Sequence, residues 1–152
     1  MVRVYRAALD YLGQLPIAAW EDPAAIRLPD LFMEEISRLG TRGVTENFIT
    51  ERPGSSEMLY LSSRATQSYE PVAVILQPGS QPFVEVRNQV RVGELIEYME
   101  QGLDVQSLTI TGMQDEEGQQ LEKANPGNKI FISAEPNLAQ GAMNGILRRK
   151  KV

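Results

Sequence analysis

The chain contains neither cysteine nor histidine among its 152 residues. The absence of cysteine excludes disulfide bonds, thiolate metal sites and a cysteine nucleophile. The absence of histidine removes the side chain most often used for acid–base catalysis and for zinc binding near neutral pH. The sequence also lacks a Walker A loop and a G-x-G-x-x-G motif, so it has no pattern for nucleotide binding. These absences predict a protein with no catalytic residues, no metal site and no cofactor.

Long apolar runs are missing as well. No stretch of the sequence is apolar over the length that spans a bilayer. The first residues, MVRVYRAALDYLGQL, are too polar and too periodic for the apolar part of a secretory signal. We therefore expect a soluble protein with no membrane partner and no secretion by a signal peptide, located in the cytoplasm or in a virion.

The net charge of −5 is unevenly distributed along the chain. Between Val92 and Glu122 the sequence carries eight acidic residues and no lysine or arginine, whereas four of the 15 basic residues occupy the last five positions. This pattern predicts two interaction sites. The acidic face comprises Glu94, Glu97, Glu100 and Asp104, and the basic tail comprises Arg148, Arg149, Lys150 and Lys151.

Helical spacing dominates the first part of the chain and turn residues dominate the middle. Apolar side chains recur at helical spacing within residues 4–14, and Pro29 opens a second helical pattern that reaches Leu39. Three Pro-Gly tetrads then favour tight type II turns and antiparallel strands. The tetrads are Arg52-Pro53-Gly54-Ser55, Gln77-Pro78-Gly79-Ser80 and Asn125-Pro126-Gly127-Asn128, and the predicted strands are 44–51, 58–63, 71–77, 83–91, 107–111 and 129–133.

Residues 71–103 carry the clearest local pattern. Val84, Val86, Val90 and Val92 fall on one parity and alternate with polar residues, which indicates a strand with one buried face. From Val92 the apolar residues follow helical spacing through Leu103, and Gly102 is placed as a cap. The strand is therefore expected to run almost directly into an amphipathic helix.

The order hairpin, helix, strand, loop, strand over residues 72–133 resembles the β-grasp fold of ubiquitin-like proteins and small sulfur carriers. The resemblance implies a binding scaffold only, because those proteins act through a C-terminal Gly-Gly that this chain lacks. We predict an α+β fold with a mostly antiparallel sheet, one packed helix, and helical N-terminal and C-terminal arms. The predicted domains are an N-terminal arm, 1–43, a core, 44–134, and a C-terminal arm with a basic tip, 135–152.

Other chemistry has weak support. Glu34 and Glu35 point about 100° apart on a helix, so we expect a solvated face and not an acid–base pair. Asp115, Glu116 and Glu117 lack the ligand spacing of a calcium loop and predict a plain acidic turn. Ser-Lys catalysis would use Ser107 or Ser133 with Lys123 or Lys129, yet no signature marks such a pair.

The function expected from these patterns is a non-catalytic structural or assembly subunit, including a capsid or tail component of a virion. Its partners would be other protein subunits in a homo- or hetero-oligomer. The alternative is an adaptor or nucleic-acid-associated module that uses the basic tail. Nucleic acid is the less favoured partner, because the chain is acidic and has no surface of interleaved basic and aromatic residues. Two further interpretations stay open: the basic tail is only a solvated terminus, or the protein is a hydrolase of unrecognised type.

Overall fold

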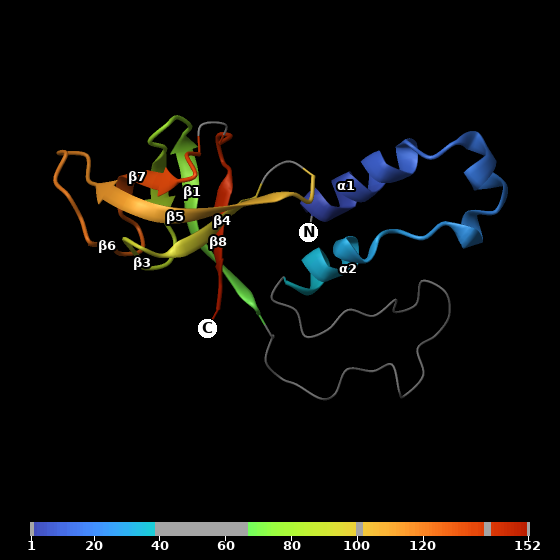
Figure 1. The fold of residues 1–152 in the computed structure, drawn as a ribbon, viewed down its shortest axis with the longest axis horizontal. Coiled ribbons are helices and arrows are strands. Elements are labelled where there is room, and N and C mark those ends of the chain that lie inside the picture. Colours follow the sequence, from blue (N-terminus) through green and yellow to red (C-terminus); the bar gives the residue numbers. More distant parts are fainter. Residues whose placement is uncertain (1, 39–66, 100–101, 139–140, 152) are drawn as a thin grey trace. The chain divides into compact units, whose positions relative to one another are not determined.

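The computed structural model describes residues 2–38, 67–99, 102–138 and 141–151. The chain divides into two compact units, Met1–Ser68 and Tyr69–Val152. The first unit is helical and the second is built of strands (Figure 1). None of the helices in the described ranges is long and apolar enough to cross a bilayer. The predicted strands 44–51 and 58–63 and the tetrad Arg52–Ser55 lie outside the described residues.

The helical unit contains two α-helices, as the sequence predicted. Helix α1 spans Val2–Gly13 and helix α2 spans Asp30–Ser37, with the short 3-10 helices η1 (Ile17–Glu21) and η2 (Pro23–Ala25) between them. The rings of Tyr11 and Phe32 meet edge to face with centroids 5.9 Å apart, an arrangement that aromatic pairs favour. This contact holds the two helices against each other.

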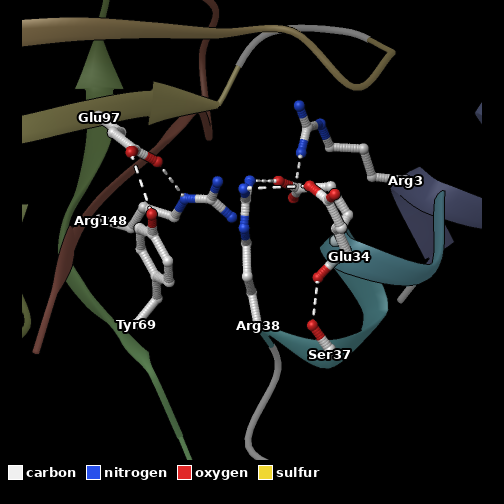
Figure 2. A network of polar contacts seen from close by, with 8 residues as sticks. Arg3, Glu34, Ser37, Arg38, Tyr69, Glu97 and Arg148 are labelled. Carbon is white, nitrogen blue, oxygen red and sulfur yellow. Dashed lines mark hydrogen bonds and ion pairs between the residues drawn. The ribbon is translucent and has the colours of Figure 1, made fainter. Parts of the chain in front are cut away.

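A buried carboxylate adds to the packing of α1 on α2. Glu35 is only 2% exposed and forms ion pairs with Arg3 of α1 and with Arg38. Figure 2 shows Arg3 and Arg38 on this side of α2, with Glu34 and Ser37 beside them. The expected solvated face is therefore correct for Glu34, which is 60% exposed, and wrong for Glu35. Two guanidinium groups compensate the cost of removing the Glu35 carboxylate from water.

The second unit is a closed antiparallel barrel of six strands in the order β1-β2-β7-β5-β4-β8. A separate two-stranded sheet pairs β3 with β6. The strands are β1 (Tyr69–Gln77), β2 (Phe83–Val86), β3 (Val90–Arg91), β4 (Leu95–Met99), β5 (Val105–Gln114), β6 (Lys123–Ala124), β7 (Lys129–Glu135) and β8 (Ile146–Lys150). Closure leaves no strand of the six with an open edge.

The core of the barrel follows the alternation seen in the sequence. Val84, Val86 and Val90 are at most 1% exposed, and Val92 packs against the same cluster, so the predicted buried face is confirmed. The turn between β6 and β7 is also confirmed: Gly127 has φ +87°, and the amide of Asn128 donates to the carbonyl of Asn125. Alternation and turn chemistry are local signals, which is why the sequence reveals them.

The predicted helix over residues 92–103 is wrong, and with it the β-grasp resemblance. Gly93 turns the chain at φ +87°, and Leu95–Met99 forms strand β4 between β5 and β8. Ile96 and Tyr98 point into the core at a spacing of two, while Leu95 is 66% exposed. A short apolar run fits both periods, and pairing with two neighbouring strands decides in favour of the strand.

The predicted helical C-terminal arm is also wrong. Ile146–Lys150 is strand β8, which pairs with both β1 and β4 and closes the barrel. Gly145 does not interrupt a helix, since its role is close packing. A side-chain carbon at this position would lie 2.7 Å from Tyr98 and 2.8 Å from the carbonyl oxygen of Ala142. No other residue type fits there without movement of the surrounding chain.

Strand β8 provides a direct test of barrel closure. Leu147 is 1% exposed and its neighbour Ile146 is 41% exposed. Leu147→Ala is expected to lower the free energy of unfolding by about 2–5 kcal/mol, because it removes buried methyl groups and leaves a cavity. The control Ile146→Ala is expected to cost about 1 kcal/mol or less.

Both variants of the full chain can be compared by urea denaturation, followed by circular dichroism. Fluorescence of Trp20, the only tryptophan, reports on the helical unit instead. Equal losses in the two variants would contradict the assignment of Leu147 to the core.

Candidate functional site

The basic residues near the C-terminus lie on β8, between two strands that carry acidic residues. The register places Arg149 opposite Glu70 of β1 and Arg148 opposite Glu97 of β4. Opposite charges on directly paired residues stabilise neighbouring strands. The acidic face and the basic tail of the sequence therefore meet within one chain.

Arg148 lies in the first of two polar clusters on this strand. Its Nε donates a hydrogen bond of 2.8 Å to Glu97, and its guanidinium carbon lies 4.5 Å from the centroid of the Tyr69 ring. The Tyr69 hydroxyl approaches the same carboxylate at 3.4 Å. Figure 2 shows Tyr69 and Arg148 converging on Glu97. The planar guanidinium can stack on the ring and pair with the carboxylate at once, which a lysine cannot do.

Arg149 lies in the second cluster, at the end of the barrel core. Its Nε and Nη2 donate to Glu70 at 2.8 and 2.6 Å, and its Nη1 donates to Glu94 at 2.6 Å and to the Gln89 carbonyl at 2.8 Å. Arg149 follows the buried Leu147 by two residues, so both side chains project from the same face of β8. The cluster thus covers one end of the core.

A β-bulge in β1 brings Glu70 to this position. The pairing of β1 with β8 shifts by one residue between Pro71 and Ala73, so Ala73 lies opposite Leu147 and Glu70 opposite Arg149. The extra residue, Val72, is fully buried. Without the shift, the Glu70 side chain would project from the other face of the sheet, away from Arg149.

The surroundings of Arg149 fix its charge. Partial burial opposes the charged form, but the hydrogen bonds and the charges of Glu70 and Glu94 outweigh it and raise the pKa of Arg149 above its ordinary value. A raised pKa in the folded state stabilises the fold below the unfolded-state value and is lost only as the pH rises through the folded-state value. Both lie at extreme alkaline pH, so this arginine stays charged wherever the barrel is folded.

A groove of about 850 Å³ lies beside these clusters. This volume falls within the range of pockets that hold small ligands. Its walls come from β1, from β4 with the preceding residue, and from β8 with the following residue. The groove is lined by Tyr69, Glu70, Glu94, Leu95, Glu97, Arg149, Lys150 and Lys151.

The groups that line the groove differ in whether they have hydrogen-bond or ion-pair partners within the chain. All three carboxylates form ion pairs with Arg148 or Arg149. Within the described part of the chain, the side chain of Lys150 takes part in no hydrogen bond or ion pair, whereas Lys151 pairs with Glu70 at 4.0 Å. Leu95 presents an apolar side chain that is 66% exposed. The groove therefore offers the ammonium group of Lys150 and an apolar surface to a ligand.

The structure brings together most of the residues that the charge pattern singled out. Glu94, Glu97, Arg149, Lys150 and Lys151 line the groove, and Arg148 supports it. Asp104 is exposed before β5 and does not line the groove, and Glu100 lies outside the described residues. Sequence analysis missed Tyr69, Glu70 and Leu95. The only local signal for Glu70 is that it shares the parity of Val72, and the bulge that brings it opposite Arg149 cannot be seen in the sequence.

The other candidate side chains serve local structure. The Asp115 carboxylate accepts hydrogen bonds of 3.0 and 2.8 Å from the amides of Glu117 and Gln119, so it caps its own turn. The Ser133 hydroxyl accepts a hydrogen bond of 2.9 Å from the side chain of Gln81. Among the residues described, no cluster of three carboxylates could hold a metal ion.

Removal of the Arg149 charge tests the cluster. Arg149→Met leaves Glu70 and Glu94 partly buried without their partner and is expected to cost about 1–2 kcal/mol of unfolding free energy. This is less than for a fully buried pair, because the three side chains are 21–28% exposed.

The control Lys150→Met removes the same charge from the next position and is expected to change stability by about 0.5 kcal/mol or less. Urea denaturation at low and at high salt measures both. Equal stability of the two variants at low salt would show that the Arg149 pairs contribute nothing.

Comparison with known proteins shows a match to one protein family. Residues 67–145, slightly more than half of the chain, match the family model described as the peptidase family U32 C-terminal domain. No curated protein matches the chain. The match corrects the expected function: neither a virion or assembly subunit nor an adaptor or nucleic-acid module with a basic tail agrees with a domain of peptidases. The expected location in a virion is wrong for the same reason.

Two crystal structures are similar to about half of the chain. Both are of the C-terminal domain of a putative U32 peptidase from Geobacillus thermoleovorans, one of them a selenomethionine variant. The variant is 20% identical, with a TM-score of 0.45 and coverage of 53% of this chain and 99% of that chain. The other is 19% identical, with a TM-score of 0.44 and coverage of 53% and 91%. On the strength of the family match, the chain belongs to the family of peptidase U32 C-terminal domains.

Proposed function

We propose that the barrel is a non-catalytic domain that binds a polypeptide segment on behalf of a U32-family peptidase. The groove beside β8 is the observation that supports this proposal. It combines an exposed apolar side chain, Leu95, with charged groups held in fixed positions on three strands. Such a mixture of apolar and polar groups in a concave surface is typical of binding sites.

The proposal that the domain is not catalytic is supported by the residue types it lacks and by the ion pairs of its carboxylates. The sequence offers no histidine or cysteine as general base or nucleophile. The carboxylates of the groove are engaged in ion pairs with arginines, which is a structural role. Peptide hydrolysis would then belong to another part of a U32 peptidase, which would be the protein partner of this domain.

The cytoplasm is the compartment we propose. A chain without cysteine needs no oxidising environment to reach its fold. Ion pairs such as Arg149 with Glu70 connect its strands in place of disulfide bonds.

Peptide binding to the full chain tests the proposal. The probe is a set of fluorescein-labelled nonapeptides of mixed sequence, half with free C-termini and half with C-terminal amides. We expect a saturable rise in fluorescence anisotropy and no cleavage of the peptides. Leu95→Asp is expected to weaken binding about tenfold, because it places a charge on the apolar wall of the groove.

The control is Val105→Asp, an exposed position on β5 away from the groove lining, which should bind as the unchanged chain does. Cleavage of the peptides by the purified chain, or equal binding by the two variants, would refute the proposal.

A further inference from the structure

We propose that the groove recognises a peptide carboxylate that lies next to an apolar side chain. This inference rests on the proposed function, because it names the class of peptide that the groove would hold. The carboxylate would pair with Lys150 and Lys151, and the apolar side chain would lie on Leu95 and against Tyr69.

The sign of the ligand charge follows from which groups are engaged. Glu70, Glu94 and Glu97 already accept hydrogen bonds of 2.6–2.8 Å from Arg148 or Arg149. Arg149 and Lys151, which also line the groove, already face carboxylates. The ammonium group of Lys150 is left without a partner in the described part of the chain. An anionic group can therefore bind without displacing an existing pair.

The same carboxylates limit how much negative charge the groove can take. Clusters that bind nucleic acid neutralise many phosphates with lysine and arginine, and their affinity grows with the number neutralised. Here three glutamates line the same wall, and a chain of phosphates laid along it would meet them at close range. A ligand with one or two negative charges fits this arrangement better than a polyanion.

The apolar part of the ligand site is provided by β4 and β1. Leu95 is the first residue of β4 and points away from the core, with 66% of its surface exposed. Tyr69 begins β1, directly opposite Lys150 of β8, and its ring, which packs on Arg148, lines the same groove. Burial of Leu95 by an apolar ligand group would add affinity that an isolated anion lacks.

The backbone of Lys150 is held in place before any ligand arrives. Lys150 belongs to the ladder of β8, and the preceding residue, Arg149, ties the strand to Glu70 and Glu94. The backbone therefore needs no ordering on binding, and only the lysine side chains lose freedom. Preorganised groups of this kind retain more of their interaction energy as affinity.

The ligand carboxylate has two sources, a peptide C-terminus or an acidic side chain, and the experiment separates them. Three fluorescein-labelled alanine-based heptapeptides that end in leucine serve as probes. The first has a free C-terminus, the second a C-terminal amide, and the third an amide together with one internal glutamate. A labelled single-stranded DNA 12-mer is the fourth probe.

We expect the full chain to bind the free acid or the glutamate peptide at least about tenfold more tightly than the neutral amide, and more weakly at high salt. Preference for the free acid identifies the C-terminus as the source, and preference for the glutamate peptide identifies the side chain. The double variant Lys150→Ala with Lys151→Ala should remove this preference.

The matched control, Lys123→Ala with Lys129→Ala, removes the same charge from β6 and β7 and should keep the preference. Both pairs of lysines are exposed, so neither double variant is expected to unfold the barrel. Equal binding of all three peptides would overturn the carboxylate inference and leave the proposed function standing. No binding of any peptide would overturn both, and tighter binding of DNA than of the peptides would overturn the choice of a peptide.

Discussion

The pairing of Arg149 with Glu70 and Glu94 is the interaction on which the barrel depends. It joins β8 to β1 and to the start of β4, the two strands that would otherwise have open edges. The hydrogen bonds of the ladders join the strands, yet they do not by themselves specify the register. A guanidinium held by two carboxylates and one backbone carbonyl specifies it, because a shift of one residue would leave these charges without partners.

The same residues that close the barrel also line its groove. Arg148 and Arg149 keep the carboxylates occupied, and the ammonium group of Lys150 has no partner in the described part of the chain. Under the proposed function, stability and recognition are therefore coupled in one place. A substitution in this cluster would affect both, whereas a substitution at Leu95 would affect recognition with little effect on the core.

Sequence patterns predicted the parts of this fold that depend on neighbours along the chain. The valine alternation of β2 and β3, the Pro-Gly turn at Gly127 and the two N-terminal helices needed no distant partner. The assignment of β4 and β8 failed because five residues fit a helix and a strand about equally, and only the flanking strands decide between them. Likewise the charge clusters were visible, but Arg149 and Glu70 lie 79 residues apart and meet through a bulge.

The position of β8 in the chain has a consequence for synthesis in the cell. β1 is the first strand of the barrel to be made and its closing partner is the last, so most of the domain separates them. The barrel can therefore close only after residue 150 has left the ribosome, and until then β1 and β4 each present an unsatisfied edge. Contacts between such distant residues also slow folding. Nascent chains of this domain should thus depend on chaperones to shield β1 and β4 from the time each strand is made until β8 is complete.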